Sequence, residues 1–556
     1  MRRSLLVTLL LGIAGGHLAR AGQPARAPKA MVVSREAHAT DAGVGVLQAG
    51  GNAVDAAVAV GFALAVTHPA AGNLGGGGFM LIRFADGRTT FLDFRERAPE
   101  KASRDMYLGP DGQPTEDSLT GWRAPAVPGT VRGLEFASKK YGRKQWAELL
   151  APAIELASKG FPVSYGLAQS LRGAKKLAQF PESKRIFLKG GALYQPGERL
   201  AQPELAATLK RLAAAGARDF YEGETARRLV AAMQVNGGLW TAADLADYAV
   251  VERKPLSGRY RGYDIIGAPP PSSGGVGVLE MLGMLEGTGY QKPGAGSAAA
   301  IHYVAEVMRR YYADRAEYLA DPDFARVPVA GLLDPAYLAR RRQSIDPERA
   351  TPSARLGPGK PPGEERAETT HYSVVDAAGN AVAVTYTLNG GYGCGVTPPG
   401  VGFLLNNEMD DFAVKPGAPN MYGLIQGDRN AIQPRKRPLS SMTPTIVLKE
   451  GRPYLVAGSP GGPRIISTVL QVLLNVLDFG MDVQEAVDWP RFHHQWLPDR
   501  LLMERGFSPD TVALLERRGH QVERVRALGE VAAILVREGR LEGAADSRAE
   551  GKAAGY

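Results

Sequence analysis

The chain has 556 residues, 44% of them hydrophobic and 22% charged, and its 66 Lys and Arg residues against 57 Asp and Glu give a net charge of +9. This composition is typical of a globular protein and excludes the disordered and fibrous classes. The single cysteine, Cys394, excludes an intrachain disulfide and any metal site built from several cysteines.

Residues 1–21 have the features of a secretory signal peptide. Arg2 and Arg3 begin the segment, an apolar run follows at 5–14, and small residues precede a cleavage site before Gly22. The apolar run is too short to span a membrane, and no later run reaches about 18 apolar residues. We therefore expect a periplasmic or secreted mature protein without a stable membrane span.

The N-terminal region alternates helices with strands. Small apolar residues predict helices over 41–49 and 52–66, and a glycine-rich loop at 73–78 precedes a hairpin with strands at 79–84 and 89–94. No basic stripe interleaved with aromatic residues occurs anywhere in the chain, so we expect no nucleic-acid partner.

The middle of the chain is predicted to be mostly helical, and the C-terminal third mostly β. Apolar spacing is helical from about 130 to 340, and a Pro- and Gly-rich segment at 351–368 is predicted to be a solvated linker. Beyond it we expect helices over 463–479 and 508–518, and strands at 371–376, 381–388, 445–448, 454–457, 531–536 and 541–545. Hairpins with separate helices predict an α+β fold with antiparallel sheets between helical layers.

Several motifs that suggest chemistry do not have the context they need. The loop at 73–78 follows a helix and precedes a strand, the reverse of a phosphate-binding loop. The segment 458–462, GSPGG, lacks the glycine that a nucleophile elbow needs two residues before its serine. His493 and His494 are adjacent and would point to opposite faces of an extended segment, so we expect no metal site.

The junction between the linker and the next predicted strand carries a candidate nucleophile. If the peptide bond between Glu368 and Thr369 were cut, Thr369 would carry both a hydroxyl and a free α-amine. The pKa of such an amine is about 7.7–8.0, so the amine can serve as general base for its own hydroxyl. A threonine at the start of a strand is also ordinary, so this junction alone leaves both interpretations open.

Seven segments together resemble the gamma-glutamyltransferase (gamma-glutamyltranspeptidase) family of N-terminal nucleophile hydrolases. The segment 369–376, TTHYSVVD, is similar to the processing site of this family, and matches follow the family's order at 73–78, 94–99, 404–412, 436–442, 458–462 and 491–496. The resemblance implies a four-layer αββα sandwich and a precursor that cuts itself between Glu368 and Thr369. The products would be a large subunit, 22–368, and a small catalytic subunit, 369–556, which together form one intertwined domain.

The resemblance also implies the catalytic roles. Thr369 would attack the γ-glutamyl carbonyl, and Thr387 would support the nucleophile. The backbone N–H groups of Gly461 and Gly462 would bind the oxyanion, since glycines let the main chain approach closely. The γ-glutamyl ester on Thr369 would then be resolved by water or by an amine.

Seven further positions match the substrate-binding residues of the family: Arg95, Asn389, Glu408, Asp411, Tyr422, Ser440 and Ser441. By the resemblance, the arginine and the two serines bind the α-carboxylate, and a guanidinium suits a carboxylate bidentately. The two acidic residues and the asparagine hold the α-ammonium, and the tyrosine covers the site from a lid loop, 416–427. Asp410 is expected to face away from its neighbour.

The function implied is an autoprocessing γ-glutamyl hydrolase and transpeptidase that acts on glutathione and related compounds, with water, an amino acid or a dipeptide as acceptor and no cofactor. A glutaryl-type cephalosporin acylase and a poly-γ-glutamate depolymerase of the same fold remain as alternatives, and an uncleaved binding protein as a third. Glu408 and Asp411, as acidic residues that can bind an α-ammonium, favour a glutamyl substrate over a glutaryl one. The predicted lid argues against a polymeric substrate, which would need an open cleft.

Overall fold

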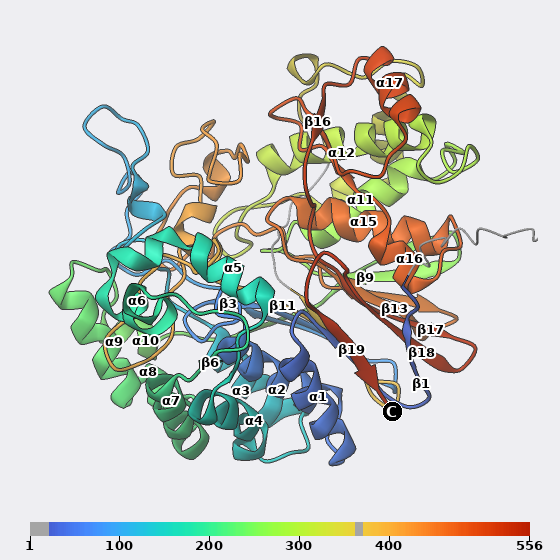
Figure 1. Cartoon of the computed structure of the whole chain (residues 1–556). Coiled ribbons are helices and arrows are strands. Elements are labelled where there is room, and N and C mark those ends of the chain that lie inside the picture. The colour runs from blue at the N-terminus through green and yellow to red at the C-terminus, as the bar shows by residue number, and fades with distance from the viewer. Residues whose placement is uncertain (1–21, 362–370) are drawn as a thin grey trace, which may run out of the picture.

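The computed structural model describes residues 22–361 and 371–556, so the predicted signal peptide, Glu368 and Thr369 lie outside the described residues. Two antiparallel sheets of seven strands each form the centre (Figure 1). The first sheet has the order β19 (Lys552–Gly555), β2 (Met31–Ser34), β10 (Tyr372–Val375), β11 (Ala381–Thr387), β3 (Gly77–Arg83), β4 (Thr89–Phe94) and β7 (Val251–Arg253). The second has the order β1 (Ala25–Ala27), β18 (Arg540–Ala545), β17 (Ala532–Arg537), β13 (Arg452–Gly458), β12 (Thr445–Lys449), β9 (Tyr263–Gly267) and β8 (Leu256–Tyr260).

Each sheet is covered on its outer face by helices, which completes the four layers (Figure 1). The helices over the first sheet include α1 (Ala37–Gln48), α2 (Ala53–Thr67), α3 (Thr130–Tyr141), α4 (Trp146–Lys159) and α7 (Pro203–Ala215). Those over the second include α11 (Gly274–Leu285), α12 (Ala298–Tyr318), α15 (Arg464–Leu477) and α16 (Val483–Asp488). The predicted αββα sandwich is therefore confirmed.

Shorter elements complete the chain. The remaining α-helices are α5 (Tyr165–Gly173), α6 (Pro181–Phe187), α8 (Arg218–Tyr221), α9 (Glu224–Val235), α10 (Ala242–Ala246), α13 (Val329–Leu332), α14 (Pro335–Gln343) and α17 (Pro509–Arg517). Two small sheets are formed by β5 (Phe161–Pro162) with β6 (Arg199–Leu200), and by β14 (Phe492–His493), β15 (Leu501–Met503) and β16 (Val522–Arg524).

Apolar side chains that alternate along the strands fill the space between the sheets. Phe79 and Leu81 of β3 and Ile446 of β12 are fully buried there, as are Val456 of β13 and Ile534 of β17. The other face of the first sheet packs on α2, every residue of which is buried. A helix that is apolar all round must lie inside a core, and this one begins with a capping box between Asn52 and Asp55.

The four hairpins predicted from the sequence are confirmed. β3 pairs with β4, β10 with β11, β12 with β13 and β17 with β18. Three strands inside the mostly helical middle region, β7, β8 and β9, are not predicted from the sequence. These strands are short and partly exposed, and glycine and charged residues interrupt their apolar pattern.

Strands from both sides of residues 362–370 interleave in both sheets. In the first sheet β10 pairs with β2, with Val374 opposite Val32, and β11 pairs with β3, with Val384 opposite Met80. In the second sheet β12 pairs with β9. Upstream, most of residues 351–361 are exposed, but the Ser353 N–H donates to Asp499 Oδ2 at 2.7 Å and holds the predicted linker against the body.

Candidate active site

A cavity of about 340 Å³ opens beside the ends of two central strands, one from each sheet. β11 ends at Thr387, and the glycine loop 458–462 follows β13. Seven of the predicted site residues line this cavity: Thr387, Asn389, Glu408, Asp411, Tyr422, Gly461 and Gly462. Arg95, Ser440 and Ser441 are fully buried. The structure therefore brings seven predicted positions, which span about 75 residues from Thr387 to Gly462, to one cavity. Arg95, Ser440 and Ser441 do not line it.

Arg95 connects the buried and the exposed parts of the site. It follows the last residue of β4, and its Nη2 donates to Asp411 Oδ2 at 2.7 Å, while Nη1 donates to Glu408 Oε1 and lies 3.4 Å from Glu96 Oε2. Glu408 and Asp411 are the two ends of a short 3₁₀ helix, Glu408–Asp411. We call Arg95, Glu96, Glu408 and Asp411 the Arg95 cluster; it holds three carboxyl groups around one guanidinium.

Burial disfavours the ionised forms of the three carboxyl groups in the Arg95 cluster. Burial raises the pKa of Glu96 to about 7, and Arg95 only partly opposes this. Burial also raises the pKa of Glu408 well above its usual value and raises that of Asp411, again against the charge of Arg95. One Glu408 oxygen and one Glu96 oxygen are buried with no hydrogen-bond partner among the described residues. A cation that entered from the cavity would favour the ionised forms of these carboxyl groups and could bind their unpartnered oxygens.

The segment before β12 passes behind Arg95. Arg95 Nε donates to the Pro438 carbonyl at 3.3 Å, and Ser440 and Ser441 follow in the same segment. The hydroxyl of Ser441 is buried and makes no hydrogen bond within the described part of the chain. Buried hydroxyls without a partner are uncommon in proteins, and such a group is available to a ligand.

Asp410 faces away from Arg95, as the sequence predicted. Its Oδ1 accepts from Ser118 Oγ at 3.1 Å, and its Oδ2 accepts from the Met421 N–H at 3.1 Å. Asp410 thus holds the loop 416–427 from outside, while Asp411 faces the cavity.

The glycine loop and Tyr422 lie against each other. Gly462 has φ of +57°, and a Cβ at this position would lie 2.8 Å from Tyr422 Cδ1, so only glycine fits. The Tyr422 hydroxyl donates to the Asn389 carbonyl at 2.8 Å, and Gln495 Nε2 donates to the Tyr422 carbonyl at 3.2 Å. The predicted lid residue is therefore held over the cavity from both sides.

Thr387 and Asn389 are positioned by the glycine-rich loop 73–78. Asn73 Nδ2 donates to the Thr387 carbonyl at 2.9 Å, and a Cβ on Gly76 would lie 1.9 Å from the same oxygen. The Thr387 hydroxyl accepts from the Asn389 N–H at 2.8 Å. The loop that could not bind phosphate has a packing role, because its glycines let β3 and β11 approach at the site.

Other candidates from the sequence are accounted for by packing. His493 contacts Ser467 Oγ at 2.8 Å, and His494 contacts Asp499 Oδ1 at 3.2 Å. Burial raises the pKa of the Cys394 thiol to about 12, which disfavours a nucleophilic thiolate. Within residues 22–361 and 371–556 no group of three His, Cys, Asp or Glu side chains is arranged to hold a metal ion.

The match to known proteins agrees with this geometry. The family model described as gamma-glutamyltranspeptidase matches residues 39–556. The chain belongs to the gamma-glutamyltranspeptidase family. Proteins named glutathione hydrolase proenzyme are 52% identical in Escherichia coli (strain K12) and 50% identical in Pseudomonas sp. (strain A14), each over 96% of this chain and 93% of the relative.

Two solved structures extend the comparison. Helicobacter pylori gamma-glutamyltranspeptidase is 44% identical with a TM-score of 0.58, covering 61% of this chain and 96% of that chain. A cephalosporin acylase from Bacillus halodurans is 28% identical with a TM-score of 0.86, covering 99% of both chains. The gamma-glutamyltranspeptidase fold is thus shared with an acylase, and the substrate must be argued from the site.

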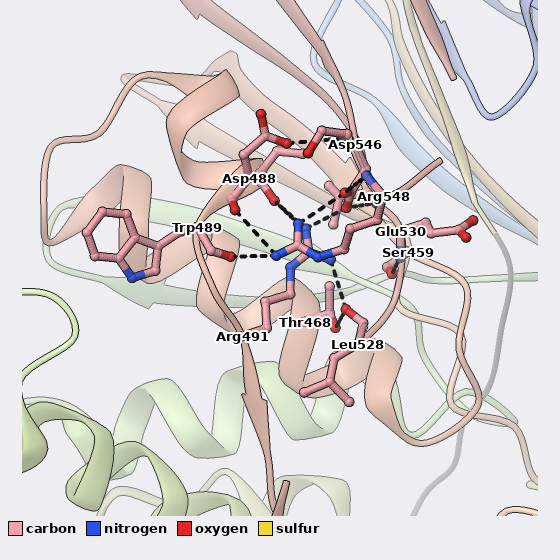
Figure 2. A network of polar contacts seen from close by, with 12 residues as sticks. Ser459, Thr468, Asp488, Trp489, Arg491, Leu528, Glu530, Asp546 and Arg548 are labelled. Atoms are coloured by element: carbon pink, nitrogen blue, oxygen red, sulfur yellow. Dashed lines mark hydrogen bonds and ion pairs between the residues drawn. The ribbon is translucent and has the colours of Figure 1, made fainter. Parts of the chain in front are cut away.

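In this member of the gamma-glutamyltranspeptidase family a second polar network supports one wall of the cavity (Figure 2). Arg491 Nη1 donates to the Leu528 carbonyl at 2.8 Å, and Asp546 Oδ2 accepts from Arg491 at 2.6 Å and from the Val531 N–H at 2.8 Å. These bonds fix the loop 527–531, of which Gly529 lines the cavity. The segment 491–496 matches the family in sequence, but this match alone predicts no role for Arg491.

Three charged or titratable residues of the cavity wall are not predicted from the sequence. Arg35, His68 and Glu530 line the cavity, and they come from three distant parts of the chain. No spacing or motif relates them in the sequence, so only the fold could identify them.

Proposed function

We propose a mechanism for γ-glutamyl hydrolysis and transfer in this enzyme, whose relatives are named glutathione hydrolase proenzymes. The observation that carries it is the Arg95 cluster, with three buried carboxyl groups around one guanidinium. A γ-glutamyl substrate brings an α-carboxylate and an α-ammonium. The ammonium supplies the second positive charge that the cluster needs, beside Glu408, Asp411 and Asn389.

The α-carboxylate would bind to Arg95 and to the hydroxyls of Ser440 and Ser441. Support for this comes from the buried Ser441 hydroxyl without a described partner and from the passage of its segment behind Arg95. The α-carboxylate of the substrate must share Arg95 with Glu408 and Asp411. The α-ammonium of the substrate enters together with this carboxylate, so binding leaves the net charge of the site unchanged.

Chemistry would take place on Thr369. After cleavage its amine takes the proton from its own hydroxyl, the oxygen attacks the γ-carbonyl, and the leaving amine takes up a proton as the C–N bond breaks. Thr387 would support the nucleophile, and the N–H groups of Gly461 and Gly462 would bind the oxyanion. Water or an amine then attacks the γ-glutamyl ester and releases Thr369. Tyr422 would limit the entry of water.

The same threonine would cut the precursor between Glu368 and Thr369. Interleaving of strands from both sides of this bond supports a stable heterodimer of fragments 22–368 and 369–556 in one domain. Removal of residues 1–21 as a signal peptide would place the enzyme in the periplasm or outside the cell. In the described ranges, no helix combines the length and the apolar character needed to cross a membrane.

An acylase activity on glutaryl compounds is the weaker alternative. It is suggested by the likeness to the Bacillus halodurans cephalosporin acylase and to proteins named acylase ACY 1 proenzyme, which are 42% identical. A glutaryl group has no α-ammonium, so it would bring no further positive charge to Glu408 and Asp411.

A comparison of two donors tests the function. The purified wild-type enzyme should release an aryl amine from a γ-glutamyl anilide, and a dipeptide acceptor should increase this release. The matched glutaryl anilide, which lacks only the α-amine, should be turned over at least about a hundredfold more slowly, because each lost buried ionic contact costs about 2–5 kcal/mol. Equal turnover of the two anilides would contradict the glutamyl assignment.

The KM for the γ-glutamyl donor should rise as the pH falls below about 7. Burial raises the pKa of Glu96 to about 7 and also raises the pKa values of Glu408 and Asp411, so acid protonates the groups that attract the ammonium. If one proton competes with the substrate, KM rises up to about tenfold per pH unit. Initial rates between pH 5.5 and 8 measure this, and Glu96→Gln should move the rise to lower pH. A KM that stays constant over this range would argue against the assignment.

A further inference from the structure

The cavity carries a second set of charged side chains, on elements other than those of the Arg95 cluster. Arg35 lies between β2 and α1, His68 follows α2, and Glu530 precedes β17. Arg35 Nη1 forms an ion pair with Glu530 Oε2, and Arg35 Nε donates to His68 Nε2 at 3.1 Å. Burial and the charge of Arg35 hold the pKa of His68 well below its usual value, so His68 is a neutral acceptor here. Glu530 alone balances the charge of Arg35 among these three residues.

This pair is open to the cavity, unlike the Arg95 cluster. The Arg35 and Glu530 side chains are 34% and 27% exposed, against 1% for Glu408 and 8% for Asp411. Arg35 is also the only Lys or Arg among the described residues that line the cavity. A guanidinium has five N–H donors, and Glu530 and His68 engage one each. An incoming carboxylate can therefore bind Arg35 without first displacing Glu530.

Glu530 is held next to the glycine loop. Its N–H donates to Ser459 Oγ at 3.1 Å, and a Cβ on Gly461 would lie 3.4 Å from Gly529 Cα. Figure 2 shows the Glu530 carboxylate directed away from Arg491 and Arg548, so it does not join the network that fixes its loop. The pair is thereby set at a fixed position relative to the backbone of Gly461.

We propose that Arg35 binds the terminal carboxylate of the peptide that leaves the γ-glutamyl group, and of the peptide that accepts it. The inference rests on the proposed function. The glutamyl end of glutathione carries one carboxylate, which is assigned to Arg95, and the departing peptide carries a second one. For that second carboxylate, the described residues of the cavity wall offer one cationic side chain, Arg35. Release of the peptide from the γ-glutamyl group and transfer of that group to an accepting peptide are the reverse of one another, so the leaving and the accepting peptide share this subsite. Glu530 partly neutralises the charge of Arg35 in the subsite.

A second cleft gives this subsite room. Arg35 and His68 also line a second cleft of about 550 Å³, together with residues of β5 and of the segment 547–550. A peptide longer than two residues can extend past Arg35 into it.

The ratio of two donor activities tests the proposal. For each variant, kcat/KM is measured for glutathione, whose leaving peptide has a carboxylate, and for a γ-glutamyl anilide, whose leaving group has none. In Arg35→Met the ratio of glutathione to anilide should fall about tenfold or more, since a hydrogen bond to a charged group contributes about 1.5–3 kcal/mol. Arg35→Lys, which keeps the cation, should restore most of the ratio. An unchanged ratio in Arg35→Met would overturn the proposal.

The acceptor provides a second measurement. In Arg35→Met the KM for glycylglycine as acceptor should rise about tenfold relative to the KM for its C-terminal amide. An equal rise in KM for both acceptors would show that the substitution disturbs the cavity wall in general, and it would overturn the assignment.

Glu530→Gln keeps Arg35 and removes its counter-charge, so the ratio of kcat/KM for glutathione to that for the anilide should stay at or above that of the wild type. If the wild type cleaved neither donor, the proposed function itself would be wrong. Failure of the proposed function can therefore be distinguished from failure of the Arg35 subsite.

Discussion

Thr369→Ala is expected to leave the precursor as one chain with no γ-glutamyl turnover. Alanine has no hydroxyl to attack the Glu368 carbonyl, so neither the cleavage of the precursor nor the later attack on substrate can occur. Loss of a nucleophile lowers kcat on the order of 10⁵- to 10⁶-fold. A denaturing gel should show two bands for the wild type and one for the variant, and N-terminal sequencing of the small fragment should read Thr-Thr-His-Tyr.

Thr369→Ser is the matched control, because it keeps both the hydroxyl and the α-amine. It should still divide into two fragments and retain measurable turnover of a γ-glutamyl anilide. Two fragments in Thr369→Ala, with a new N-terminus at residue 369, would show that another group cuts the chain. The nucleophile would then have to be sought elsewhere in the cavity.

Much of the fold follows from local sequence patterns. The hairpins β3–β4 and β12–β13 have apolar strands separated by short turns, and their residue ranges agree with the prediction within about two residues. The edge strands β7 and β8 have weaker patterns because one side of an edge strand is exposed. β7 joins its sheet by pairing with β4, with Arg253 opposite Phe91, and no local pattern encodes a partner so distant in the chain. β8 pairs with the next strand, β9, and is brought to its sheet through the pairing of β9 with β12.

The site divides in the same way. Residues within long motifs, such as Asp411 and Gly462, could be proposed from the sequence because the resemblance covers their neighbours as well. Glu96 stands in a matched segment, yet its part in the Arg95 cluster depends on the fold, which brings β4 to the 3₁₀ helix Glu408–Asp411. Arg35 and Glu530 are 495 positions apart, so their ion pair is visible only in three dimensions.

Asp411→Asn should lower kcat/KM for a γ-glutamyl donor by about 30- to 3,000-fold while the precursor still divides into two fragments. The change keeps the shape of the side chain but removes a charge that faces the cavity beside Arg95. Truncating one partner of a buried charge pair costs about 2–5 kcal/mol, and each 1.4 kcal/mol is a factor of ten. Donor saturation curves measure the loss, which should appear mainly in KM because the ammonium is bound before the reaction as well as during it.

Asp410→Asn is the control for this change, one residue away and with the same chemistry. Asp410 binds Ser118 and the Met421 N–H, and an asparagine oxygen can still accept either bond. Burial raises the pKa of Asp410 to about 7, so near neutral pH the variant replaces a carboxyl that is already partly protonated. Its KM should therefore stay within about threefold of the wild type. If both variants lost donor affinity equally, the loss would come from the 3₁₀ helix as a whole, and the ammonium would not be bound by the Asp411 carboxylate.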